Sequence, residues 1–338
     1  MVKFILQIIL FSILVVAGYF FIANKTGQPN TVYSGFSFNY MAGIRLKHQR
    51  AKELKQPKIL FVGGSSLAYG MDSELVEKTL LVPVVNLGLH GGLGVSFTLN
   101  QAKKLLKKGD IVFISIEYLM GKGDYELIER TCLEFPEVAD LREFSLKQEI
   151  QIDLNKTRED LVTYIEDKPK KRVPNIPSAW PANFKKNYNP LREFNKYGDY
   201  TQHLGRKGWY KRRSDESKFQ YRYWEGIELL NKFNAAAKEK GADVFFIYPP
   251  LAKEVYDLHV TTINKLHKDL KNNLDFEVLN TPEDFVFENS YFYDTHYHLI
   301  KEGRSLRTKK QLEFFMQNEQ VLSCIKKAAS FQTKNIQK

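Results

Sequence analysis

Residues 58–67 of this 338-residue chain read KILFVGGSSL, and this stretch decides the fold. After Lys58 the run is wholly apolar up to residue 62, and it stops abruptly at Gly63 and Gly64. A short apolar run that ends in glycine is typical of a strand buried on both faces of a parallel sheet. The sequence therefore predicts such a strand, with a serine-containing turn at its carboxyl end.

Strand and helix patterns alternate on the carboxyl side of this first strand. The further strands are expected at residues 84–86, 111–116, 244–248 and about 276–279, and the helices between them at residues 72–81, 96–108, 224–240 and about 261–274. Asp72 is placed to cap the first of these helices, and Gly109 and Gly241 follow the ends of two others. This alternation predicts a right-handed, doubly wound α/β sheet.

The N-terminal segment is a long apolar run. Residues 4–23 carry no charge, and at about 1.5 Å per residue such a helix spans the roughly 30 Å hydrocarbon core of a bilayer. A cleaved signal peptide has a shorter apolar region of about 7–15 residues, whereas this run ends in the bulky residues 19–21. We therefore expect residues 1–23 to be an uncleaved transmembrane anchor and the folded domain to lie outside the cytoplasm. Basic residues on both sides of the run leave its orientation open.

A long segment between the third and fourth strands lacks the alternation and is strongly basic. The whole chain has 50 Lys and Arg against 39 Asp and Glu, a net charge of +11. Residues 168–213 alone hold 13 basic and two acidic residues, together with five prolines and eight aromatic residues that include Trp180 and Trp209. Because linkers carry few aromatic residues, we expect an inserted cap over the sheet. Its expected ligand is an acidic glycan or phosphate-bearing polymer, with membrane headgroups as the alternative, while nucleic acid is disfavoured because no recognised module is present.

These features divide the chain into five parts. The expected parts are an anchor at residues 1–23, a juxtamembrane segment at 24–56, an α/β domain at 57–120 and 224–316, the basic aromatic insertion at 121–223 and a basic tail at 317–338. The two cysteines, Cys132 and Cys324, allow one disulfide bridge or none and exclude a disulfide scaffold.

Three polar clusters follow predicted strands, and ligands of open α/β sheets bind beyond the carboxyl ends of the strands. The clusters are residues 63–67, residues 86–91 and residues 294–299. Each cluster has an alternative explanation. Residues 63–67 could be a turn that caps the next helix, the glycines of residues 86–91 could serve close packing, and His296 and His298 could bind a metal. The glycine spacing fits no dinucleotide or phosphate loop, and no further ligand cluster accompanies the two histidines. We therefore expect neither a cofactor nor a metal.

Taken together, the three clusters resemble the motifs of the SGNH (GDSL-type) hydrolase superfamily. The first family motif, Gly-Asp-Ser-Leu, is similar to Gly64-Ser65-Ser66-Leu67. The second, Asn-x-Gly-x-x-Gly, is similar to residues 86–91. The last, Asp-x-x-His-Leu-x-x-x-Gly, is similar to the stretch that contains His298, Leu299 and Gly303. The resemblance covers residues 24–316 without the insertion, and it implies a flavodoxin-like three-layer α/β/α sandwich with about five parallel strands.

The resemblance also implies a set of catalytic roles. Ser66 would be the nucleophile, His298 the base that takes its proton, and Asp294 the acid that orients the imidazole. A serine hydroxyl is a weak nucleophile until such a base is present. The backbone N–H groups of Ser66 and Gly91 would form the oxyanion hole.

Two departures from the family pattern concern the same site. Asp294 stands four residues before His298, and Thr295 occupies the family's usual position three residues before it. The third family motif, Gly-x-Asn-Asp, is replaced by Ile116-Glu117-Tyr118 after the third strand. Glu117 and Tyr118, with Trp180 and Trp209 of the insertion, are candidates for substrate contact, and packing of Tyr118 under the insertion is the alternative.

The Gly-Ser-Ser variant, the single anchor and Tyr248-Pro249-Pro250 after the fourth strand resemble the DltD- and AlgX/AlgJ-like branch of the superfamily. This branch implies a membrane-anchored, extracytoplasmic serine esterase or O-acyltransferase that acts on a surface polysaccharide, with acetyl as the leading acyl group. A transferase would need an integral-membrane acyl-donor partner. The alternative is a catalytically inactive scaffold of a polysaccharide-modification or export complex.

Overall fold

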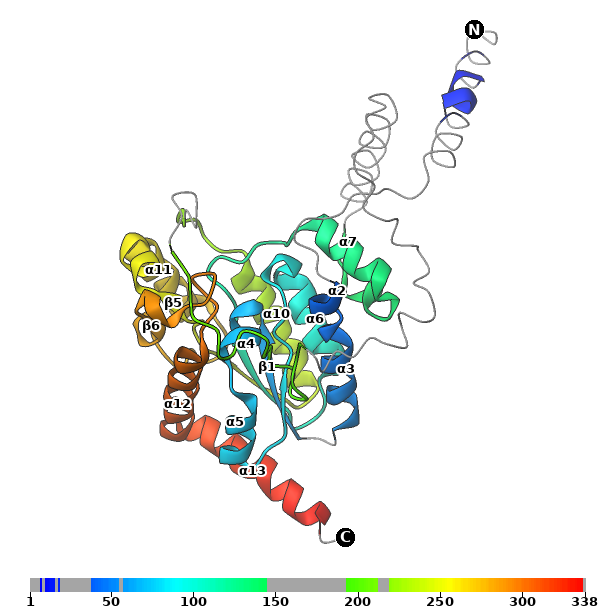
Figure 1. Ribbon diagram of the computed structural model, residues 1–338. Helices are drawn as coiled ribbons and strands as arrows, with labels where there is room; N and C mark the ends of the chain where they lie inside the picture. The colour runs from blue at the N-terminus through cyan, green and yellow to red at the C-terminus, as the bar shows by residue number, and fades with distance from the viewer. Residues whose placement is uncertain are drawn as a thin grey trace. The chain divides into compact units, whose positions relative to one another are not determined.

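The computed structural model (Figure 1) describes residues 7, 10–15, 18, 38–54, 57–144, 193–211 and 219–336. The chain forms two compact units, Met1–Phe36 with Phe144–Tyr188, and Ser37–Glu143 with Asn189–Lys338, and the elements given below belong to the second. Among the described residues, no helix is both long and apolar enough to span a membrane. The predicted anchor lies mostly outside the described residues, apart from a helical stretch at residues 10–15.

The predicted α/β architecture is confirmed by a parallel sheet of four strands. These are β1 (Ile59–Gly63), β2 (Val84–Asn86), β3 (Ile111–Ser115) and β4 (Asp243–Phe246), in the order β2-β1-β3-β4. The first three are buried along their whole length, as expected for strands covered on both faces. The order is compatible with a flavodoxin-like fold.

Helices cover both faces of the sheet (Figure 1). One group that packs together consists of α3 (Gly43–Glu53), α6 (Gly94–Leu105) and α10 (Gly226–Glu239), with α2 (Phe38–Met41), α7 (Tyr125–Glu134) and η2 (Pro136–Leu141) beside it. The other consists of α4 (Ser65–Gly70), α5 (Ser73–Leu80), α12 (Lys301–Gln317) and α13 (Glu319–Ile336). A second, two-stranded parallel sheet pairs β5 (Leu251–Ala252) with β6 (Val286–Phe287), next to α11 (Lys253–Asn273), η4 (Pro282–Phe285) and η5 (Asn289–Tyr291).

A row of phenylalanines ties the C-terminal helices to the sheet. Phe61, Phe113 and Phe245 are register partners on neighbouring strands, and their rings stack with centroids 5.6 and 5.7 Å apart. Phe315 of α12 stacks on Phe113 at 3.9 Å. Because all four side chains are buried, this row fixes α12 against the strands and so positions the loop that precedes it.

The fifth strand predicted near residues 276–279 is reduced to a single parallel bridge between Phe246 and Val278. The backbone of Phe246 donates to Glu277 O at 2.8 Å and accepts from Leu279 N at 2.9 Å. The ladder ends one step later because the side chain of Asn280, rather than a backbone carbonyl, accepts the next N–H, that of Tyr248, at 2.9 Å.

Part of the predicted insertion belongs to the α/β body instead of forming a separate cap. Tyr197 O accepts the N–H of Asn86 at the end of β2, and the N–H of Tyr200 donates to Ala68 O in α4, both at 2.8 Å. Buried Asp199 accepts hydrogen bonds from the backbone and side chain of Ser73. The stretch around residues 194–204 thus supports the turn between β1 and α5.

The remaining expectations concern the cysteines and the tail. Cys132 and Cys324 are both free and buried, so no disulfide joins them. The predicted basic tail contains α13, whose apolar face, including Val321 and Ile325, packs into the core.

Candidate active site

Asp294 and His298 form the hydrogen-bonded pair expected from the sequence. Asp294 Oδ1 lies 2.7 Å from His298 Nδ1. The unusual four-residue spacing is explained by Thr295, whose Oγ1 accepts the N–H groups of Tyr297 at 3.3 Å and His298 at 3.2 Å. Thr295 therefore stabilises the turn, and Asp294 contacts the imidazole.

The pairing determines what the imidazole can do. An ionised carboxylate only accepts hydrogen bonds, so Nδ1 of His298 carries the proton that it donates to Asp294. In the neutral ring, Nε2 is then the proton acceptor. The His298 side chain is 13% exposed and that of Asp294 is 25% exposed, so neither member of the pair is fully buried.

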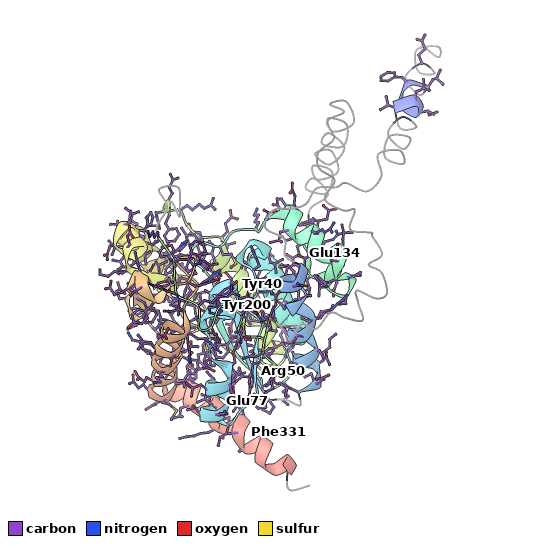
Figure 2. The ribbon with its side chains drawn as sticks, viewed as in Figure 1. Tyr40, Arg50, Glu77, Glu134, Tyr200 and Phe331 are labelled. Atoms are coloured by element: carbon purple, nitrogen blue, oxygen red, sulfur yellow. The ribbon has the colours of Figure 1, made fainter. Side chains whose placement is uncertain are left out.

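Tyr69 of α4 holds the plane of the His298 ring. The two rings are stacked with centroids 3.8 Å apart and planes inclined by 6°. Tyr69 in turn contacts Tyr200 at 4.5 Å and His203 at 4.8 Å between centroids. Tyr40 of α2 also joins this aromatic cluster, with its ring centroid 5.5 Å from that of Tyr200 (Figure 2). The cluster leaves the imidazole little freedom to rotate.

The structure separates the two serines that follow β1. Ser66, the expected nucleophile, is fully buried, and its Oγ has no hydrogen-bond partner, so it is neither bonded to His298 nor open to a substrate. Ser65 is the first residue of α4 and is partly exposed. Since residues four apart lie on the same face of a helix, Ser65 shares a face with Tyr69, the residue on which His298 stacks. The family motif, as aligned above, points to Ser66, and the partial exposure of Ser65 is visible only in the structure.

Glu117 lies against the same turn from the end of β3. Its Oε1 accepts the N–H of Ser66 at 2.8 Å, and its Oε2 is buried without a hydrogen-bond partner. A Cβ added to Gly64 would lie 2.3 Å from Oε2, and one added to Gly91 would lie 3.8 Å from the carboxyl carbon. The Ser66 N–H expected in an oxyanion hole is therefore already occupied, and Gly91 adjoins the carboxyl group.

Arg307 of α12 contacts the carbonyl group of the same residue, Ser66. Its Nη1 donates to Ser66 O at 2.7 Å and its Nη2 to Ser115 Oγ at 3.1 Å. Burial lowers the pKa of Arg307 to about 9, and the charge of Glu117 opposes this shift. The sequence does not point to Arg307, because nothing near it in the chain indicates that it reaches the start of α4 and the end of β3.

The second cluster is largely structural. Asn86 donates to Leu67 O and to Asp199 Oδ1, both at 2.9 Å, and it accepts the N–H of Gly88 at 2.9 Å. His90 caps η1 (Gly91–Leu93) by accepting the N–H of Gly92 on Nδ1, and burial lowers its pKa. His296, the other histidine of the last cluster, is buried beside Tyr297 and its pKa is lowered by burial to about 4.

The proposed substrate-contact residues fall into different environments. Tyr118 is buried between Phe219 and Tyr248, which agrees with the packing alternative. The Trp209 side chain is exposed, with Trp209 retaining 64% of its accessible surface. Its backbone N–H donates to the backbone carbonyl of Tyr293, the residue that precedes Asp294, at 2.6 Å. Trp180 lies outside the described residues.

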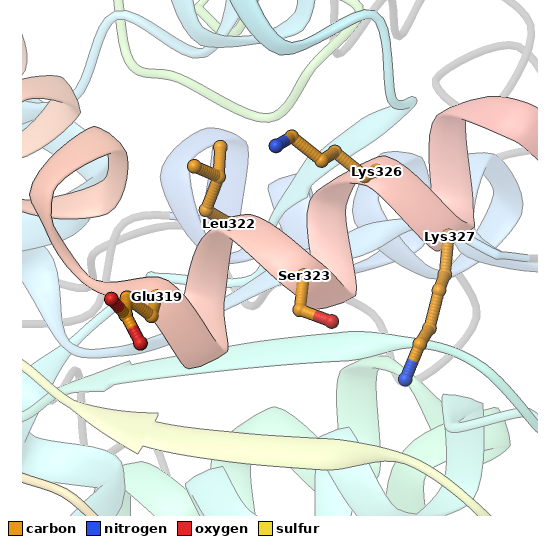
Figure 3. A pocket seen from close by; sticks show the side chains of 5 residues that line it. All are labelled: Glu319, Leu322, Ser323, Lys326 and Lys327. Atoms are coloured by element: carbon orange, nitrogen blue, oxygen red, sulfur yellow. The ribbon is translucent and has the colours of Figure 1, made fainter.

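An open hollow lies elsewhere, on α13, where Glu319, Leu322, Ser323, Lys326 and Lys327 line it (Figure 3). It contains none of the residues of the three motif clusters. Among the described residues, no group of three or more His, Cys, Asp or Glu side chains could hold a metal ion.

The structure therefore stacks the Asp294–His298 pair on Tyr69 of α4, the helix that begins with Ser65, and places Glu117 against the N–H of Ser66 in the same helix. No protein-family model matches the chain, and no curated protein matches it.

Proposed function

We propose that the protein is a serine acyl-esterase or acyltransferase of the SGNH type, with Ser65 as the nucleophile, His298 as the base and Asp294 as the orienting acid. The observation that carries the proposal is the Asp294–His298 pair, stacked on Tyr69 one helical turn from the accessible Ser65. Serine acyl transfer requires a nucleophile, a base and an orienting acid, and Ser65, His298 and Asp294 are residues of these three types.

Ser65 replaces Ser66 in this proposal for a reason that is also visible in the sequence. The family motif can be placed one residue earlier, so that Gly63-Gly64-Ser65 corresponds to Gly-Asp-Ser. Gly63 is the last residue of β1, and Ser65 then begins α4. In this register Ser66 stands in the place of the apolar leucine of the motif, in keeping with its complete burial.

The reaction follows from the proton path. Ser65 Oγ attacks the carbonyl carbon of an ester while His298 Nε2 takes the hydroxyl proton, and His298 returns this proton to the departing alcohol. Asp294 stabilises the imidazolium that forms in between. The resulting acyl-serine is resolved by water in an esterase, or by the hydroxyl group of a second substrate in a transferase.

The proposed substrate is an acylated, most simply O-acetylated, surface polysaccharide or related anionic polymer. Exposed Trp209 supports a sugar ligand because its indole lies edge-on to Tyr293, 6.2 Å between centroids, beside the Asp294–His298 pair. Arg206 and Lys207, both exposed, supply positive charge to the same loop. An integral-membrane protein would deliver the acyl group in the transferase case, and residues 4–23 would anchor the domain to the outer side of the membrane.

A scaffold without catalytic activity is the second candidate. It is favoured by one observation: the carboxyl group of Glu117 lies where the family places a side-chain amide donor for the oxyanion. A negative charge beside a developing oxyanion opposes acyl transfer.

The deciding experiment compares wild type with Ser65→Ala and Ser66→Ala on p-nitrophenyl acetate and on an O-acetylated glycan, with and without a hydroxyl acceptor. We expect Ser65→Ala to abolish turnover and Ser66→Ala to retain it. Capture of the acyl group by the acceptor would identify a transferase. Equal rates in all three proteins would overturn the enzymatic proposal and favour the scaffold.

Protease digestion of intact spheroplasts tests the location of the domain. A domain that is protected from the protease there would contradict an extracytoplasmic site.

A further inference from the structure

We infer that Glu117 is a positioning residue for the proposed nucleophile: it fixes the first turn of α4 through the N–H of Ser66 and thereby sets the direction of the Ser65 side chain. This inference rests on the proposed function, and its test below is read out separately from activity.

Side chains bind both backbone polar groups of Ser66, its N–H and its carbonyl. The carboxyl group of Glu117 accepts the Ser66 N–H at 2.8 Å, and the guanidinium of Arg307 donates to the Ser66 carbonyl at 2.7 Å. Both side chains are buried, Glu117 with 8% of its surface exposed and Arg307 with none. The peptide groups on either side of Ser66 are therefore fixed to β3 and α12, and the orientation of the Ser65 peptide follows from theirs.

One carboxyl oxygen of Glu117 is buried without a hydrogen bond, and this supports a functional role for the residue. A buried carboxyl oxygen without a hydrogen bond costs stability, and such groups in native proteins call for an explanation. Within the described part of the chain Glu117 Oε2 has no hydrogen-bond partner, whereas an apolar residue after β3 would leave no polar side-chain atom unpaired. Holding the turn next to the nucleophile explains why a carboxyl group occupies the position.

Gly64 is part of the same arrangement. The three atoms nearest to a Cβ built on Gly64 all belong to the Glu117 carboxyl group, at 2.3, 2.5 and 2.7 Å. A side chain at position 64 would therefore push the carboxyl group off the Ser66 N–H. We therefore expect a side chain at position 64 to disturb the same contact that a change of Glu117 removes.

One consequence concerns the oxyanion. A backbone N–H that already donates to a carboxylate at 2.8 Å is not available to a second anion without losing that bond. An oxyanion hole at this site would therefore use donors other than the Ser66 N–H.

The first test measures hydrogen exchange of the Ser66 amide in the full chain. We expect protection in wild type and in Glu117→Gln, whose amide oxygen can accept the same bond, and at least tenfold faster exchange in Glu117→Ala. Equal protection in wild type and Glu117→Ala would overturn the inference, whatever the enzymatic activity.

The second test measures the rate at which a fluorophosphonate probe labels the active serine. Glu117→Ala should be labelled at least tenfold more slowly than wild type at an unchanged half-saturating probe concentration, and Glu117→Gln should stay within about threefold of wild type. Gly64→Ala should slow labelling as Glu117→Ala does, and it should have no further effect in the Glu117→Ala background. Gly121→Ala serves as the matched control, since a Cβ there meets nothing within 4 Å.

The outcomes separate the two proposals. Absence of labelling in wild type, with the Ser66 amide protected by Glu117, would contradict the proposed function alone. Labelling of wild type and Glu117→Ala at equal rates would contradict the positioning role and leave the serine enzyme in place.

Discussion

At the scale of the residue, His298 is constrained by a hydrogen bond in its plane and by a ring above its face. The first prediction concerns this hydrogen bond: Asp294→Asn should lower kcat by about 10²- to 10⁴-fold. The amide can donate to Nδ1, so it no longer fixes the tautomer in which Nδ1 carries the proton. Circular dichroism should show an unchanged fold. A kcat within threefold of wild type would show that His298 does not depend on Asp294.

The stack between Tyr69 and His298 gives a second prediction. Tyr69→Phe keeps the ring 3.8 Å from the imidazole and should retain most of the activity. Tyr69→Leu should lower kcat by about tenfold with little change in KM, since an aromatic pair contributes on the order of 1 kcal/mol beyond its buried area. Steady-state kinetics on p-nitrophenyl acetate measure both. Equal loss in the two variants would assign the effect to the Tyr69 hydroxyl instead of the stack.

The Asp294–His298 pair is the part of the candidate site that the sequence predicts directly. Asp294 and His298 could be predicted because the motif lies within a few consecutive residues. The motif assigns the nucleophile to Ser66, and it contains no information on which of the two adjacent serines is buried. The roles of Glu117 and Arg307 depend on contacts across 51 and 241 positions of the chain, which no local pattern contains.

At the scale of the element, the close approach of β1 and β3 depends on Gly63. A Cβ at this residue would lie 1.9 Å from the carbonyl oxygen of Ser115, its register partner. Gly63→Ala should therefore lower the free energy of unfolding by about 2–3 kcal/mol, a typical cost of overpacking.

Urea unfolding of Gly63→Ala beside wild type measures this cost, and Gly121→Ala is again the control with open space around it. Equal unfolding midpoints in the two variants would mean that the strands can separate at Gly63 without loss of stability.

The four strands of the main sheet were predictable because each is a short apolar run ended by glycine, proline or a polar residue. The pairing at residues 276–279 is shorter than their apolar pattern predicts, because the side chain of Asn280 ends it and the pattern contains no sign of this. The charge and aromatic content of the stretch that contains Tyr197 and Tyr200 predict a cap. Composition carries no information on its backbone hydrogen bonds to Asn86 and Ala68.

At the scale of the whole molecule, three buried histidines make stability depend on pH. His48, His203 and His296 are at most 8% exposed, and burial lowers the pKa of each from 6.5 to about 4. Between pH 6.5 and 4 the unfolded chain binds protons at these positions and the folded protein does not, so the free energy of unfolding falls as the pH falls through this range. One pKa unit corresponds to about 1.4 kcal/mol, and the total loss should reach several kcal/mol.

Urea unfolding at pH 7, 5.5 and 4.5 measures this dependence. Replacing each histidine singly by Gln should reduce the slope, because one proton-binding site of the unfolded chain is removed. A slope that is the same in all three variants as in wild type would assign acid sensitivity to the carboxylates alone.

Mapping the residue that a fluorophosphonate modifies tests the assignment of Ser65 as the nucleophile. Full-length protein is labelled, digested and analysed by mass spectrometry, in parallel with Ser65→Ala, Ser66→Ala and His298→Ala. We expect the probe on Ser65, continued labelling of Ser66→Ala, and no labelling of Ser65→Ala or His298→Ala. Labelling of Ser66, or no serine-dependent labelling in wild type, would contradict this assignment.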